Sequence, residues 1–349
     1  TDATKNDGFS ESTLPLSVNL VAGTTNFNVF FVTAENKQTV LRMTAPGLTA
    51  GESGVMVMAP GLYDRFQVVL PGQVAAPGNY VGAARGLTGT IDGDGNAGNG
   101  VTPFTAGTPF NVTIRSVDKY WNVTDSNPVN SALASTDPYD LNDPRALSLT
   151  AGTTTISWTF NTSDVTGWRL SADDGAGAND PFVTDLLPTQ PGAPTRLQIL
   201  LPGETGVPGS VTGKTGTPTA ATAGVPQAVR VNVVDANWNV VTTAGLTVRL
   251  TNNTDAFAPP LTQPLASGTT VFNFISYSAT GTSGLTVQRM SGTALPNPTS
   301  VSVAFTINPN AATRLQALVP GETWVPGQPP YNGLGGRSGV PDYDANMGN

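Results

Sequence analysis

The sequence predicts an all-β protein made of antiparallel β-sandwich domains in tandem, and three observations support that prediction. Apolar and polar residues alternate over short runs such as VRVNV at 229–233, which is the period of a half-buried strand. Turn residues are abundant, with 39 Gly and 29 Pro. Whole segments recur in a fixed order, which is typical of arrays of small domains. No stretch carries the apolar stripe of an amphipathic helix.

One opening strand occurs three times and marks the start of each repeat. The copies are RFQVVLPGQ at 65–73, RLQILLPGET at 196–205 and RLQALVPGET at 314–323. In each copy a second Pro-Gly pair follows the first at the same distance. Because proline fixes φ and glycine permits tight bends, we expect this loop to be ordered, with a defined corner at each pair.

Further blocks recur between the opening strands. They are a strand and turn at 105–125 and 222–242, a Thr-Asp pair ending at Asp2, Asp137 and Asp255, and a Gly-Thr-Thr strand at 20–31, 149–160 and 265–276. This order indicates the C-terminal part of one repeat at 1–62, complete repeats at 63–193 and 194–311, and the first strand and loop of a further repeat at 312–349.

The two partial repeats would leave unpaired strand edges and apolar residues such as Leu315 and Leu318 exposed. We therefore expect neighbouring chain to cover both ends. The cover would come from continuation of the array or from strand donation between subunits.

About seven short strands per repeat indicate a sandwich with Greek-key connections. The pattern AG-x-P-x-x-V-x-V-x-x-VD-x-x-x-N-x-V, present as AGVPQAVRVNVVDANWNVV at 223–241, resembles the bacterial immunoglobulin-like repeats of invasin-type adhesins and other large secreted surface proteins. The resemblance covers most of both complete repeats and implies tandem immunoglobulin-like sandwiches. Those repeats usually carry Gly before the turn Asn, where this chain has Trp121 and Trp238.

Composition excludes several function classes. The chain has no Cys and no His, which removes thiolate and imidazole metal sites and the usual catalytic triads. A net charge of −8 disfavours nucleic acid and anionic lipid as partners, and no apolar run is long enough to insert into a membrane. The acids that recur do so in turns, once per repeat, so we expect no enzyme and no required cofactor.

One acidic loop occurs twice and is a candidate calcium site. GLTGTIDGDGNAGN at 86–99 aligns without a gap with GRSGVPDYDANMGN at 336–349. The D-x-D-x-N spacing typical of calcium loops appears in both copies, as Asp92, Asp94 and Asn96 and as Asp342, Asp344 and Asn346. Pro103 stands where an EF-hand needs an acid, so the loop is not an EF-hand. The alternative is a solvated Asp/Gly turn. The second complete repeat lacks the acidic segment, so calcium would not be needed to fold a domain.

Two tryptophans and three arginines also recur at fixed places. Trp121 and Trp238 either form sugar-stacking platforms or cover the end of the sandwich, with the next Asn in the left-handed position of the turn. Asp118 and Asp235 are expected to hydrogen-bond their own turn. Each opening strand begins with an Arg that either pairs with a carboxylate of the preceding repeat or is solvated, namely Arg65, Arg196 and Arg314. Glycosylation is left open at four sequons, Asn111, Asn122, Asn161 and Asn252.

Repetition favours a mechanical or spacing role, in which each domain adds length and a junction. The sequence therefore predicts a structural component of an extracellular rod or filament at the cell surface. One alternative is the stalk of a large adhesin, and a second is an accessory glycan-binding module. The expected partners are copies of the chain or adjacent repeats, with surface glycans as a further candidate.

Overall fold

The protein is an all-β sandwich, as the sequence predicts. The computed structural model describes residues 17–34, 38–79, 84–96, 99–140, 143–175, 181–279, 281–332 and 334–342. These residues form strands and turns, mostly in antiparallel pairs, and no α-helix. No helix that could cross a membrane occurs among them. The chain divides into two compact units, residues 1–190 and 191–349.

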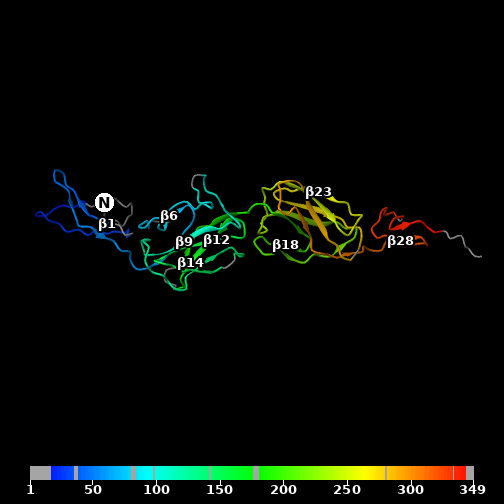
Figure 1. The fold of residues 1–349 in the computed structure, drawn as a ribbon, viewed down its shortest axis with the longest axis horizontal. Helices are drawn as coiled ribbons and strands as arrows, with labels where there is room; N and C mark the ends of the chain where they lie inside the picture. Colours follow the sequence, from blue (N-terminus) through cyan, green and yellow to red (C-terminus); the bar gives the residue numbers. More distant parts are fainter. Residues whose placement is uncertain are drawn as a thin grey trace, which may run out of the picture. The chain divides into compact units, whose positions relative to one another are not determined.

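Unit 1 contains a complete sandwich built from two main sheets (Figure 1). The first sheet has the order β12–β9–β5, with β5 at Arg65–Val69, β9 at Phe110–Val117 and β12 at Thr153–Trp158. The second has the order β11–β10–β14–β15, with β10 at Ala132–Ser135, β11 at Arg145–Ala146, β14 at Leu170–Asp173 and β15 at Phe182–Val183. Apolar side chains of both sheets meet in one core, which includes Val112, Ile114, Leu133 and Leu170.

A third, smaller sheet has the order β13–β16–β8, with β8 at Phe104–Thr105, β13 at Asp164–Trp168 and β16 at Leu187–Gln190. Strand β16 pairs in parallel with β8. The last strand of the repeat thus pairs with the short strand that precedes β9.

Unit 2 contains a second sandwich with the same plan. Its first sheet has the order β17–β21–β24, with β17 at Arg196–Leu200, β21 at Gln227–Val234 and β24 at Thr269–Phe274. Its second sheet has the order β23–β22–β25–β26, with β22 at Leu246–Asn252, β23 at Leu261–Pro264, β25 at Leu285–Gly292 and β26 at Thr299–Val301. A parallel pair of β20 (Ala221–Thr222) and β27 (Ile307–Asn308) repeats the parallel pair of unit 1.

The alternation of apolar and polar residues in the sequence corresponds to alternating buried and exposed side chains in the strands. In β21, Val229, Val231 and Val233 are buried in the core, whereas Arg230 on the other face is exposed. Asn232 is buried on that other face, where its Nδ2 donates to Gln198 Oε1 at 2.9 Å. Polar residues inside the pattern are therefore tolerated where a neighbouring strand supplies a hydrogen-bond partner.

The Pro-Gly loops form three short hairpins with one register. The pairs are β6 (Gln73–Ala75) with β7 (Leu87–Gly89), β18 (Glu204–Gly206) with β19 (Lys214–Gly216), and β28 (Glu322–Trp324) with β29 (Arg337–Gly339). The glycine before each hairpin has positive φ, +81° at Gly72, +92° at Gly203 and +84° at Gly321. The structure describes all of 202–215, where the loop is the ordered hairpin that the sequence predicts.

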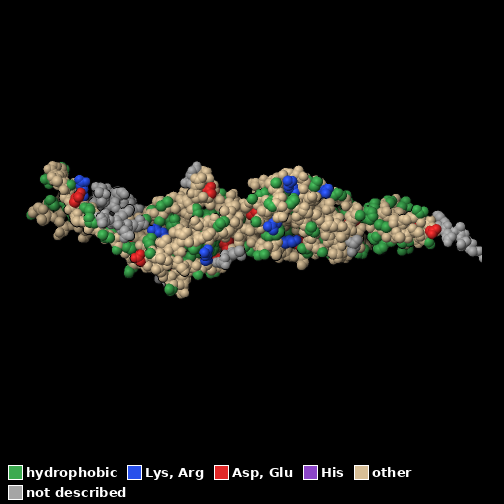
Figure 2. Space-filling view, viewed as in Figure 1, with side chains coloured by type: hydrophobic (Ala, Val, Ile, Leu, Met, Phe, Trp, Pro, Cys, Tyr) green, Lys and Arg blue, Asp and Glu red, His purple; other side chains and the backbone are tan. Residues whose placement is uncertain are grey.

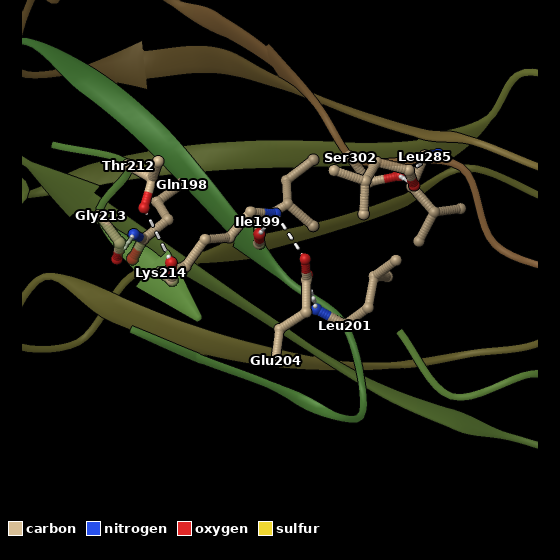
Figure 3. A network of polar contacts seen from close by, with 10 residues as sticks. Gln198, Ile199, Leu201, Glu204, Thr212, Gly213, Lys214, Leu285 and Ser302 are labelled. Carbon is tan, nitrogen blue, oxygen red and sulfur yellow. Dashed lines mark hydrogen bonds and ion pairs between the residues drawn. The ribbon is translucent and has the colours of Figure 1, made fainter. Parts of the chain in front are cut away.

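The first residue of each hairpin closes the turn before it. Glu204 Oε2 accepts the Leu201 N–H at 2.9 Å, while its Oε1 lies 2.7 Å from Lys214 Nζ (Figure 3). Glu322 bonds Val319 N and Arg337 in the same way. In the first hairpin, Gln73 Oε1 accepts the Leu70 N–H at 3.2 Å. The second and third hairpins therefore add an ion pair to this turn, whereas the first hairpin forms the turn without one.

The partial repeats contain little paired strand. Near the N-terminus, β1 (Gln38–Thr39) pairs with β4 (Met56–Val57), and β2 (Arg42–Met43) pairs with β3 (Gly51–Glu52). The third opening segment, 314–318, forms no strand. Leu315 is fully exposed there, whereas Phe66 and Leu197 at the same place are buried. Figure 2 shows apolar side chains gathered on the surface of this C-terminal segment.

Candidate functional site

The turn after β9 and after β21 is the most elaborate polar feature shared by the two sandwiches. We call residues 117–123 and 234–240 the Trp turns. Asp118 Oδ1 accepts the N–H groups of Tyr120 and Asn122 at 2.8 and 2.9 Å. Asp235 Oδ1 accepts from Asn237 and Asn239 at the same distances. Each Asp thus bonds its own turn, as the sequence predicts.

The second oxygen of each Asp holds the chain that enters the repeat. Asp118 Oδ2 accepts the Gly61 N–H at 2.8 Å, and Asp235 Oδ2 accepts the Gly192 N–H at 2.8 Å. Both glycines lie just before an opening strand. Both carboxylates are buried, and a buried carboxylate that accepts several N–H bonds is a strong structural tie.

The tryptophans, and not the asparagines, occupy the left-handed position of the turn. Trp121 has φ +68° and Trp238 has φ +67°, so the sequence-based assignment of that position to Asn was wrong. Glycine adopts left-handed backbone at no steric cost, whereas Trp does not. The Trp indoles pack onto another glycine, because a Cβ added at Gly86 or Gly213 would lie 2.3 or 2.2 Å from the Trp. A tertiary contact therefore holds a backbone conformation that Trp alone disfavours.

The opening-strand arginines lie over these indoles. The guanidinium carbon is 5.4 Å from the Trp121 ring centroid for Arg65 and 4.5 Å from the Trp238 centroid for Arg196. Arg65 Nε also lies 2.6 Å from Asp64 Oδ2 of its own repeat, so its ion pair differs from the pairing with the preceding repeat that was one of the two alternatives. Arg314 is exposed. Trp121 is only 7% exposed, which leaves no open ring face for a sugar.

The Trp turn and the opening strand also anchor the Pro-Gly hairpin. Gly78 N donates to Tyr120 O at 2.8 Å, and Gly209 N donates to Asn237 O at 2.7 Å. From the opening strand, the side-chain amides of Gln67, Gln198 and Gln316 donate to the carbonyls of Gly86, Gly213 and Gly335. The hairpin in each complete repeat is therefore fastened to the end of the sandwich at several points.

The Asn of the first Trp turn reaches the preceding partial repeat. Asn122 Oδ1 accepts the Ala34 N–H at 2.8 Å, and its Nδ2 donates to Val32 O at 2.9 Å. The side-chain amide thus pairs with the backbone as a neighbouring strand would. Phe30 packs edge-on against Tyr120 with ring centroids 5.7 Å apart. Asn122 is buried with both amide atoms bonded, so the folded chain does not offer this sequon for glycosylation.

A corresponding contact joins the second complete repeat to the C-terminal hairpin. Ser278 Oγ donates to Pro326 O at 2.9 Å, and Tyr277 stacks on Tyr331 with ring centroids 5.1 Å apart. Thr33 occupies the place of Ser278 in the N-terminal segment, and its Oγ1 lies 3.5 Å from Pro77 O. We call these two contact sets, around Asn122 and around Ser278, the inter-repeat clamp. Within each unit, the residues that follow a Gly-Thr-Thr strand therefore dock on the next Pro-Gly loop.

The Thr-Asp pairs hold the strand end that the clamp uses. Asp255 Oδ2 accepts the N–H groups of Tyr277 and Ser278. Asp137 Oδ2 accepts those of Asn161 and Thr162 at 2.8 and 2.9 Å, at the matching place in the first repeat. Sequence comparison identified this block as recurrent but gave it no role, because the partners lie more than twenty residues away. Asp2 lies outside the described residues.

The acidic loop brings only some of its predicted ligands together. Asp92 is buried, and its Oδ1 accepts the N–H and O–H of Thr102 at 3.0 and 2.6 Å. Asp94 is exposed and accepts from Asn96 N and Asn99 Nδ2. Asp342 occupies the place of Asp92 in the last segment. The Asp342 N–H donates to Pro320 O, as the Asp92 N–H donates to Pro71 O. Asp344 and Asn346 lie outside the described residues. The gapless alignment of the two loops predicts that they share one backbone, which stays a prediction beyond Asp342.

Comparisons with known proteins add little to this picture. No family model and no curated protein matches the chain. Similar solved structures include a glycosyl hydrolase family 2 member from Bacteroides cellulosilyticus (10% identity, TM-score 0.25, 70% of this chain and 29% of that chain). They also include fibronectin(III)-like modules of Clostridium thermocellum CbhA (9% identity, TM-score 0.19, 61% of this chain and 93% of that one). The chain thus spans under a third of the hydrolase. Likenesses at these TM-scores carry no argument about function.

Proposed function

We propose that this chain is a structural, non-catalytic segment of an extracellular rod or filament, in which each immunoglobulin-like domain adds length and a fixed joint. The observation that carries the proposal is the inter-repeat clamp. Its Asn122 contact uses a donor and an acceptor of one buried side chain at once, which fixes the orientation of the two backbones it joins. A flexible linker would need no such arrangement.

The use of the buried acids supports a structural role. Asp118, Asp235, Asp137 and Asp255 all accept backbone N–H groups, and these bonds tie turns and strand ends in place. A catalytic carboxylate must instead face a substrate.

The C-terminal segment supports completion by neighbouring chain. Leu315 is exposed, whereas the residues at the same place in the two complete repeats are buried in the core. The hairpin that follows Leu315 has the same register as the hairpins of the complete repeats. Adjacent repeats or copies of the same chain are the partners we propose for this edge, at a cell surface outside the cell. The stalk of a large adhesin, of the kind the sequence resembles, is the alternative that uses the same joints.

Electron microscopy of the assembled material tests the proposal. A rod or filament predicts regular order along the fibre axis, with a repeat set by the domain length. A stalk predicts single strings of domains that end in a distinct head. Isolated globules that bind sugars and never form strings would contradict both structural roles and favour the glycan-binding module.

A further inference from the structure

The loop that follows the first Pro-Gly hairpin contains a buried carboxylate oxygen that has no protein partner. Asp92 is 3% exposed, and its Oδ2 has no hydrogen-bond partner among the described residues. Its Oδ1 accepts two hydrogen bonds from Thr102. Rotating the carboxylate would therefore only exchange which of the two oxygens lacks a partner. Burying an ionised oxygen without a partner is costly, and such an oxygen calls for a cation or a proton donor.

A second carboxylate, that of Asp94, belongs to the same loop. The Asp94 N–H donates to Thr102 Oγ1 at 3.2 Å, and this hydroxyl in turn donates to Asp92 Oδ1. Asp94 Oδ1 accepts the Asn96 N–H at 2.9 Å, and its Oδ2 accepts from Asn99 Nδ2 at 2.8 Å. None of the ion pairs found among the described residues includes either Asp92 or Asp94.

The second complete repeat shows that the fold itself does not need an acid at this place. The N–H of Asp92 donates to Pro71 O at 3.0 Å, and that of Thr219 donates to Pro202 O at 2.7 Å. The backbone contact is the same, but the second complete repeat has a neutral Thr there and lacks the acidic segment. The carboxylate occurs together with the longer loop, so its role lies in that loop.

We propose that Asp92 and Asp94 bind a calcium ion, with Asp92 Oδ2 as the buried ligand and Asp94 as the outer one. Oxygen donors at a tight loop suit this hard cation, and backbone carbonyls and water would complete its shell. A site with two carboxylates corresponds to the weak end of protein calcium sites, with Kd of about 10⁻⁴–10⁻³ M. Such an affinity is useful only outside the cell, where calcium is at millimolar level. The ion would stiffen the loop without being needed to fold the domain.

Amide hydrogen exchange of the full chain with and without calcium chloride tests this site. At free calcium ten times Kd, binding to the closed loop should slow exchange through local opening about 11-fold. We expect this slowing at Gly93 and Thr102, whose backbones close the loop. The corresponding segment around Thr219 is an internal control and should not respond.

Two substitutions and one control make the test specific. Asp92→Asn keeps the acceptor for Thr102 but removes the buried charge, so it should abolish the calcium effect and leave the calcium-free fold intact. Asp94→Asn changes an exposed residue and should weaken the effect without disturbing folding. Asp185→Asn removes an exposed acid elsewhere in the same repeat and should respond to calcium as the wild type does. Equal slowing in all variants, equal slowing by sodium at matched ionic strength, or no slowing in the wild type would overturn the proposal.

Discussion

The substitution Gly213→Ala tests whether the Trp turn is held by packing of the indole on a glycine. Gly213 has φ +72°, and an added Cβ would lie 2.2 Å from Trp238 Cδ2. The left-handed backbone alone costs about 1–2 kcal/mol for a residue with a Cβ. Displacing the indole adds the loss of the Arg196 contact, worth about 0.5–1 kcal/mol, and of buried aromatic area. We expect a loss of about 2–4 kcal/mol in the free energy of unfolding of the second sandwich.

Two further glycines separate these contributions. Gly224 also has positive φ, but the nearest atom to an added Cβ is 3.9 Å away, so Gly224→Ala should cost only the backbone term of about 1–2 kcal/mol. Gly245 has neither positive φ nor a neighbour within 4 Å, so Gly245→Ala should be neutral or stabilising by up to about 1 kcal/mol. Urea-dependent hydrogen exchange of core amides in β21 measures all three in the full chain.

A double variant decides whether the clash is with Trp238. In a Trp238→Ala background, Gly213→Ala should cost no more than Gly224→Ala does, because the indole is gone. If Gly213→Ala costs the same as Gly224→Ala in the wild-type background, the packing argument is wrong. The argument is also wrong if the cost of Gly213→Ala stays unchanged without the indole.

Two further predictions concern charged groups. Lys214→Leu leaves the buried Glu204 carboxylate without its cation and should lower the free energy of unfolding by about 1–3 kcal/mol. The double variant Glu204→Gln with Lys214→Leu has the residues of the first hairpin, Gln73 and Leu87, at these places. In urea unfolding it should therefore lose less stability than Lys214→Leu alone. Burial raises the pKa of Asp140 from 3.8 to about 7. The folded state therefore holds this proton more tightly, and its stabilising effect is complete below the unfolded pKa and lost as the pH rises through about 7. Asp140→Asn keeps an acceptor for Trp158 Nε1 but cannot titrate. Between pH 5 and pH 8 the free energy of unfolding should consequently fall less in this variant than in the wild type. An equal fall would show that Asp140 does not titrate in this range.

The repeats and strands were predictable from the sequence because their signals are local. Alternation in a run such as 229–233 and the turn chemistry of the Pro-Gly pairs depend on neighbours along the chain. The hairpin was foreseen as ordered, but its strand pairing was not, because it joins residues such as Gly206 and Lys214 across a loop.

The contacts that make the candidate site were harder to predict. Trp121 adopts left-handed backbone because Gly86, far along the chain, leaves room for its indole. Asn122 bonds residues of a different repeat, and Asp255 bonds a strand end beyond two further strands. A single sequence shows that these residues recur but not which partners they meet. Their recurrence at fixed places was the one available signal.

Exchange of the Ala34 amide tests the inter-repeat clamp most directly, because its partner among the described residues is Asn122 Oδ1 at 2.8 Å. Removing a buried hydrogen-bond partner costs about 1–3 kcal/mol, and a factor of ten in exchange corresponds to about 1.4 kcal/mol. Asn122→Ala should therefore speed exchange at Ala34 by about 10- to 100-fold and leave amides in β12 unchanged. Asn111→Ala, at an exposed position of β9, is the matched control and should not affect Ala34. Fast exchange of Ala34 in the wild type, or the same rate in Asn122→Ala, would contradict a fixed joint between these repeats.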